Sequence, residues 1–197
     1  MSLVRANLSI NAYAFTHYSD GTVTPWMKGR GGAAVTVSKS GRTLFVVAGF
    51  SGNENSDVYA YDLDADTWTR VGDAMLRPCS VAGISTLVTG SVEYVVVFGG
   101  EVEESTKGHE GAGGFTNELT AFRVAEAAVG VTDAAGTAPA TSLTRVEVTV
   151  AEGDVPGARG WLGFTASAAA TAVLFGGLAG NDDAPLRLND LWSLTIA

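Results

Sequence analysis

The stretch from Glu101 to Glu118 holds the densest group of side chains that could do chemistry. It contains five glutamates, one lysine and one histidine, so its net charge is −4 with the imidazole neutral. Carboxylates and imidazoles are common ligands of metal ions, which makes a cation site here chemically conceivable. The residues that would build it are Glu101, Glu103, Glu104, His109 and Glu110. Because they lack an ordered ligand spacing, we interpret them as an acidic surface loop that holds no metal ion and no cofactor.

Two other motifs resemble ligand loops but depart from their patterns. The glycine-rich segment 108–115 does not follow the G-x-G-x-x-G spacing, no helix is expected after it, and Glu110 would repel a phosphate group. The segment 62–73 has carboxylates at EF-hand positions, yet Thr67 stands where that calcium loop needs glycine. The chain has only two histidines and one cysteine, and no nucleophile motif accompanies them. The sequence therefore favours a protein without catalytic residues.

The elements that must position these side chains follow an internal repeat. Residues 29–71 contain four short apolar or alternating runs separated by turns, which predicts four antiparallel strands. Residues 77–100 repeat the first half of this unit, residues 116–124 repeat its third run, and a third copy spans 159–197. Each copy begins near an arginine, and its second strand ends at a landmark glycine: Gly49, Gly100 or Gly177.

These landmarks resemble the kelch repeat, a four-stranded unit of roughly fifty residues. The first unit matches most fully, with Arg30, Gly49, Tyr59, Tyr61 and Trp68 all in register. In that family the units form the blades of a β-propeller, so the resemblance implies an all-β kelch-type propeller of three to four antiparallel blades. A small twisted sheet cannot bury its faces alone, and neighbouring blades must therefore stack face to face.

The units divide the chain into four parts. We expect a partial blade over residues 1–28, a blade over 29–75, a blade with insertions over 76–156, and a blade without its fourth strand over 157–197. Three units are fewer than the roughly four to eight blades that close a propeller. We therefore expect an incomplete propeller, as a portion of a larger one or as a subunit completed by another chain. Open blade edges would favour self-association or strand completion.

Three arginines, Arg30, Arg77 and Arg159, form the second group of candidate site residues. In a four-stranded meander, the connection between strands two and three emerges on the same face as the connection leading into the next blade. The arginines follow the connections that lead into the next blade, and the acidic stretch occupies a connection between strands two and three. One face of the propeller would therefore carry both the arginines and the acidic stretch. Two interpretations stay open: the arginines bridge blades through carbonyls or carboxylates, or they contact a ligand or partner.

Composition limits the kinds of partner. The 197 residues are 46% hydrophobic and 17% charged, which is typical of a globular protein. A net charge of −9 with only 12 scattered lysines and arginines argues against nucleic acid, and no apolar run reaches the roughly 18 residues of a membrane helix. The single cysteine, Cys79, excludes an intramolecular disulfide, and the N-terminus lacks a secretory pattern, so we expect a cytoplasmic location.

Together these features predict a non-enzymatic scaffold that presents propeller loops to a protein partner. The acidic stretch favours a basic partner. Two alternatives remain, since fold does not fix function. One is a small-molecule-binding or enzymatic kelch protein that uses the propeller face or channel. The other is a structural subunit of a larger assembly whose blades are completed by other chains.

Overall fold

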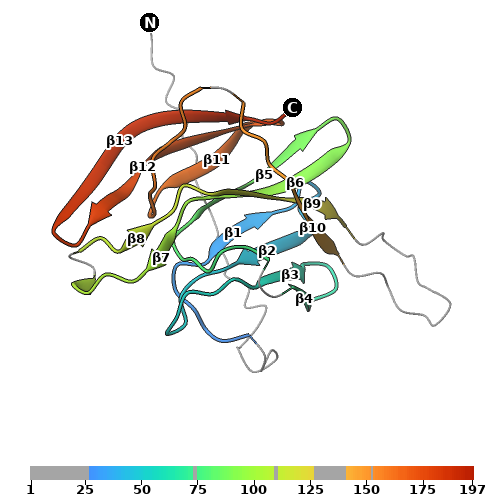
Figure 1. Ribbon diagram of the computed structural model, residues 1–197. Helices are drawn as coiled ribbons and strands as arrows, with labels where there is room; N and C mark the ends of the chain where they lie inside the picture. Colours follow the sequence, from blue (N-terminus) through green and yellow to red (C-terminus); the bar gives the residue numbers. More distant parts are fainter. Residues whose placement is uncertain (1–26, 73–74, 109–110, 127–140, 152) are drawn as a thin grey trace, which may run out of the picture.

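The computed structural model describes residues 27–72, 75–108, 111–126, 141–151 and 153–197 (Figure 1). Within these ranges every assigned element is a β-strand, from β1 to β13. No helix in the described part of the chain is long and apolar enough to cross a membrane. The strands form three stacked antiparallel sheets and one short ribbon, so the predicted all-β architecture of kelch-type blades is confirmed.

Blade 1 is the sheet of β1 (Ala34–Val37), β2 (Thr43–Val47), β3 (Val58–Asp62) and β4 (Thr67–Gly72), paired in sequence order. Each strand is short and rich in β-branched or aromatic residues, which favour pleated, half-buried positions. The turn between β3 and β4 is held by Asp62, whose Oδ1 accepts hydrogen bonds from the backbone N–H groups of Asp64 and Ala65, both 2.9 Å away. The carboxylate of Asp62 therefore shapes the turn between β3 and β4.

Blade 2 repeats this meander with an insertion. Its strands are β5 (Gly83–Thr89), β6 (Val92–Phe98), β9 (Leu119–Ala125) and β10 (Ser142–Val146). The run "VVV" at 95–97 is buried on both faces, because one neighbouring blade covers each side. Between β6 and β9 the chain forms the β7–β8 ribbon, which consists of β7 (Glu101–Glu103) and β8 (Gly114–Phe115).

Blade 3 contains β11 (Gly163–Ala168), β12 (Thr171–Asn181) and β13 (Ala184–Thr195). The sequence predicted a loop after Gly177, and this was wrong: β12 continues to Asn181 and returns as β13 in one long hairpin. A register shift between Phe175 and Gly177 lets the strand pass the double glycine without ending. In Figure 1 this hairpin reaches the β7–β8 ribbon of blade 2.

The core lies between the blades. One buried cluster joins blades 1 and 2 and includes Phe45, Val47, Val95 and Phe122. A second cluster joins blades 2 and 3 and includes Leu87, Val96 and Ala172. Each blade thus buries its apolar residues against its neighbour, so the blades depend on one another for stability.

Candidate functional site

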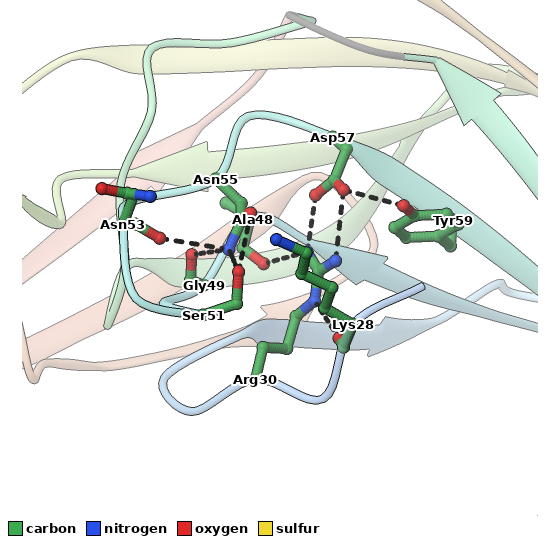
Figure 2. Close-up of polar contacts among 9 residues, drawn as sticks. All are labelled: Lys28, Arg30, Ala48, Gly49, Ser51, Asn53, Asn55, Asp57 and Tyr59. Carbon is green, nitrogen blue, oxygen red and sulfur yellow. Dashed lines mark hydrogen bonds and ion pairs between the residues drawn. The ribbon is translucent and has the colours of Figure 1, made fainter. Parts of the chain in front are cut away.

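Arg30 forms a clamp inside blade 1 (Figure 2). Its Nη1 and Nη2 atoms donate to the two carboxylate oxygens of Asp57 at 2.5 and 3.1 Å, and Nη1 also donates to the carbonyl of Ala48 at 2.9 Å. The Tyr59 hydroxyl donates to Asp57 Oδ2 at 2.8 Å, and its ring lies beneath the guanidinium, 5.2 Å from Cζ to the ring centroid. Burial alone would raise the pKa of Asp57, but hydrogen bonds from Arg30 and Tyr59 outweigh it and lower that pKa.

Arg159 forms the same clamp in blade 3. Its Nη1 and Nη2 atoms donate to Asp190 at 2.6 and 3.0 Å, and Nη1 also donates to the carbonyl of Gly176 at 3.1 Å. The indole Nε1 of Trp192 donates to Asp190 Oδ2 at 2.6 Å, as the Tyr59 hydroxyl does to Asp57. Hydrogen bonds from Arg159 and Trp192 lower the pKa of Asp190 to about 2. Both arginines therefore join three segments of their own blade.

Blade 2 has no arginine at this position. Three residues with positive φ mark equivalent points in the blades, Gly32 at 59°, Val81 at 48° and Trp161 at 57°. The residue before each of these three forms an isolated β-bridge with the residue that follows the landmark glycine of its blade. The bridged pairs are Gly31 with Phe50, Ser80 with Glu101, and Gly160 with Leu178. The residues immediately before Gly31, Ser80 and Gly160 are Arg30, Cys79 and Arg159. Cys79 therefore holds the clamp position in blade 2, and the alignment of Arg77 with Arg30 and Arg159 was wrong. Cys79 is buried, and burial raises the pKa of its thiol to about 12.

Arg77 itself is exposed, two residues before the clamp position. The carboxylate equivalent to Asp57 and Asp190 is Glu118, which immediately precedes β9 as Asp57 immediately precedes β3, whereas Asp190 lies within the longer β13. Arg145 of β10 takes over its pairing, with Nη2 donating to Glu118 Oε1 at 2.9 Å. Blade 2 thus keeps the carboxylate and draws the guanidinium from a different strand.

A cavity of about 640 Å³ opens where the three blades meet. Segments that enter the first strands supply Gly32, Val81 and Trp161, and the residues after the three landmark glycines supply Phe50, Glu101 and Leu178. The backbone links the three equivalent residues, because Val81 N–H donates to the Gly32 carbonyl at 2.7 Å and Trp161 N–H donates to the Val81 carbonyl at 2.9 Å. The walls also include Glu54, Glu104 and Arg187.

The glutamates of this cavity are held in different ways. Ser80 Oγ donates to Glu54 Oε1 at 3.2 Å, while Oε2 is buried without a hydrogen-bond partner among the described residues. Burial raises the pKa of Glu54; the Ser80 hydrogen bond opposes this rise, and the negative charges of Glu101 and Glu104 add to it. Burial also raises the pKa of Glu101, against hydrogen bonds from the backbone of Gly113 and Ser105 and from the Trp161 side chain.

The acidic stretch is anchored rather than free. Asp182, at the turn of the β12–β13 hairpin, accepts hydrogen bonds from Ser105 Oγ at 2.5 Å and from the N–H and hydroxyl of Thr106 at 2.8 and 2.5 Å. These bonds lower the pKa of Asp182 to about 2. A Cβ at Gly111 would lie 2.3 Å from Asp182 Oδ1, so a larger residue there would have to displace this carboxylate. The ribbon is thereby fixed beside the cavity.

The predicted site residues separate into three groups. Glu101 and Glu104 line the cavity, whereas Glu103 is exposed and does not. Arg30 and Arg159 are committed to their clamps. His109 and Glu110 lie outside the described residues. Sequence reasoning missed Glu54, Trp161 and Arg187; the only signal for them was that each lies close to a repeat landmark.

Comparison with known proteins agrees with this description. A family model described as the Kelch motif matches residues 30–75. The chain carries a kelch repeat. The match begins at Arg30 and covers blade 1, so the predicted resemblance is confirmed, and kelch repeats generally mediate protein–protein interaction. Among solved structures, the chain is similar to one titled "Structure of YjhT", with 16% identity and a TM-score of 0.48. The match covers 87% of this chain and 43% of that one, so this chain spans less than half of the other's length.

Proposed function

We propose that this kelch chain is a non-enzymatic binding module whose cavity receives a basic side chain of a partner protein. The observation that carries the proposal is Glu54, which lines the cavity together with Glu101 and Glu104 and has one buried oxygen without a hydrogen-bond partner in the described part of the chain. An unpaired buried acceptor costs free energy, and a guanidinium or ammonium N–H that reached it would remove that cost. A charge-assisted hydrogen bond of this kind is among the stronger ones in proteins.

The cavity has the size and composition for a side chain rather than for a bare metal ion. Its volume of about 640 Å³ lies in the range of ligand pockets. Within the described ranges, no three His, Cys, Asp or Glu side chains are grouped closely enough to hold a metal ion. Trp161, which is 54% exposed, offers an aromatic surface, and aromatic rings attract cations through their faces. Glutamates and an indole around one cavity are therefore complementary to arginine or lysine.

Binding of a defined basic peptide tests the proposal. Acetyl-hexaarginine amide and its citrulline counterpart would be titrated into the protein by calorimetry in about 150 mM salt, which screens non-specific attraction. We expect the arginine peptide alone to bind. Glu54→Gln and Glu104→Gln are each expected to weaken it about tenfold, which corresponds to roughly 1.4 kcal/mol.

Glu103→Gln is the matched control, because Glu103 lies on the same ribbon but does not line the cavity. This variant is expected to bind within about twofold of the unmodified protein. Equal losses of affinity in all three variants would mean that peptide binding depends on net charge alone. No binding to the unmodified protein would reject the cavity as a cation site.

A second candidate is a small-molecule or enzymatic site in the same cavity. It is favoured by the raised pKa values of Glu54 and Glu101, since carboxyl groups with raised pKa values occur at sites of acid–base chemistry. Thermal denaturation with arginine, spermidine and neutral sugars separates the candidates. Stabilisation by a neutral sugar that Glu54→Gln abolishes would support the second candidate over the first.

A further inference from the structure

The far face of blade 3, the side turned away from blade 2, carries a cluster of exposed apolar side chains. Phe175 of β12 and Leu191 of β13 are direct cross-strand partners, and they are 57% and 71% exposed. Val173 lies two residues from Phe175 and therefore on the same face of the sheet. We call Val173, Phe175 and Leu191 the blade 3 patch. An apolar patch on a sheet face marks an interaction site.

The repeat shows what covers this position in the other blades. Phe175 precedes the double glycine of its blade, as Val47 precedes Ala48 and Gly49 in blade 1. Leu191 follows the clamp residue Asp190, as Val58 follows Asp57. Val47 and Val58 are both 0% exposed, because blade 2 packs against them. The same two positions are therefore covered by a neighbouring blade in blade 1 and exposed in blade 3.

The complementary kind of surface lies at the other end of the same chain. Val35 and Val37 of β1 are 49% and 41% exposed, while Thr36 between them faces blade 2 and contacts Thr86 at 3.1 Å. Ile84 of blade 2 and Phe164 of blade 3 hold the position equivalent to Val35, and each packs into the cluster shared with the preceding blade. Val35 thus belongs to the surface that receives a preceding blade.

We propose that a second copy of this chain covers the blade 3 patch, with its blade 1 presenting Val35 and Val37. The contact is head to tail. In each pair of stacked blades, the face that carries the residues equivalent to Phe175 and Leu191 packs against the face of the next blade that carries the residue equivalent to Val35. The described residues of two copies supply twice three blades, or six, which lies within the roughly four to eight blades of closed propellers. A twofold arrangement makes this contact twice and closes the ring, whereas a non-closing head-to-tail contact would grow into a fibre.

Light scattering on the full 197-residue chain tests this inference. We expect the mass of a dimer, twice 20.2 kDa, at concentrations of about 1 to 100 µM. Leu191→Glu and the milder Leu191→Ser are expected to raise the dimer dissociation constant at least about tenfold, with an unchanged circular dichroism spectrum because the side chain is exposed. Val150→Glu is the matched control, since Val150 is 58% exposed and lies outside both surfaces, and it is expected to remain dimeric.

A mixing experiment distinguishes the head-to-tail arrangement from a face-to-face one. Val35→Glu alone is also expected to dissociate the dimer. Mixing the Val35→Glu and Leu191→Glu proteins restores one intact contact, so part of the dimer is expected to return. A monomer of 20.2 kDa over the whole concentration range would overturn the inference, and so would a dimer indifferent to Leu191→Glu or to Val35→Glu.

Discussion

At the scale of single residues, the repeated arginine clamp stabilises the conformation of its blade rather than contacting a partner. Arg30 and Arg159 use the same atoms on the same kinds of partner, and their side chains are only 6% and 3% exposed. A planar guanidinium suits this task because it can bind a carboxylate with two nitrogens and still reach a carbonyl. Their repetition therefore reflects the folding of each blade.

Removing one clamp should destabilise the protein strongly. Arg159→Met removes the cation that pairs with Asp190 and one donor to the Gly176 carbonyl. Because Asp190 is 37% exposed and solvent screens the pair, the expected cost is about 2 kcal/mol. The free energy of unfolding in urea measures this loss. Arg145→Met is the control, because the exposed Arg145–Glu118 pair should contribute no more than about 1 kcal/mol. Similar losses in the two variants would contradict the structural role of the clamp.

Cys79 should be nearly unreactive towards alkylating reagents in the folded protein. Only thiolate reacts with iodoacetamide, and burial raises the pKa of this thiol to about 12. At about pH 8, alkylation should therefore be roughly a thousandfold slower than that of an ordinary cysteine of pKa about 8.5. Mass spectrometry of timed samples measures the rate, and the same reaction in concentrated urea supplies the reference. Rapid alkylation of the folded chain would show that Cys79 is accessible.

At the scale of elements, the hairpin of blade 3 and the acidic ribbon of blade 2 act as one unit. Ser105 and Thr106 follow β7 of the ribbon, and both donate to the single carboxylate of Asp182 across the boundary between two blades. The ribbon also places Glu101 and Glu104 in the cavity wall. The geometry of the cavity therefore depends on a side chain that does not line it.

Loss of the Asp182 carboxylate should loosen the ribbon. Asp182→Ala removes the acceptor of the Thr106 N–H, so hydrogen exchange at this amide should accelerate at least about tenfold. Asp183→Ala is the control, because Asp183 is almost fully exposed and pairs only with Lys107 among the described residues. An unchanged exchange rate in Asp182→Ala would mean that the ribbon holds its position without this anchor.

The pH dependence of this anchor follows from the lowered pKa of Asp182. A carboxyl group whose folded pKa lies below its unfolded value of 3.8 stabilises the folded form fully above 3.8. This contribution is lost as the pH falls through the folded pKa of about 2. Protection of the Thr106 amide should therefore persist under mildly acidic conditions. Loss of protection well above the unfolded pKa would contradict the assignment.

The elements also show how far the sequence alone could lead. Runs such as "YVVVFGG" repeat with their glycines, so the blades and the strand ends at Gly49 and Gly100 were predictable. Arg77 lies two residues before Cys79, and this offset concealed the true register, because an arginine near a strand looks equivalent in sequence whether or not it occupies the clamp position. The long hairpin was hidden for a physical reason: Gly176, Gly177 and Gly180 all have positive φ and resemble strand breakers, yet a bulge keeps them in the ladder.

The cavity could be predicted only in part for a related reason. Glu101 and Glu104 stand out in sequence because they belong to a dense acidic run. Glu54 lies in a loop of blade 1 and Trp161 in a connection to blade 3, so nothing local joins them to that run. Only the stacking of three blades brings these residues to one place. A site built between repeats has no signature within any single repeat.

At the scale of the whole molecule, the arrangement of charge gives the cavity a definite pH response. Its glutamates lie on different blades, and stacking the blades both buries them and brings their negative charges together. Burial raises the pKa values of Glu54 and Glu101 above their ordinary value of 4.5. When ionised, these groups therefore oppose the folded state, and this cost disappears as the pH falls below the unfolded value. A bound cation would offset the same cost at neutral pH.

Binding of acetyl-hexaarginine amide should therefore weaken as the pH is lowered from about 7 towards 4, and the loss should begin at a higher pH than the protonation of carboxylates of ordinary pKa. The reason is that the cation needs the ionised glutamates, and their raised pKa values move their protonation to a higher pH. Calorimetric titrations at several pH values measure the change. Glu54→Gln should flatten the profile, because the variant lacks one titrating group, while Glu103→Gln should keep it. Binding that is constant over this range in the unmodified protein would mean that the cation is held by other charges, and the cavity glutamates would lose their proposed role.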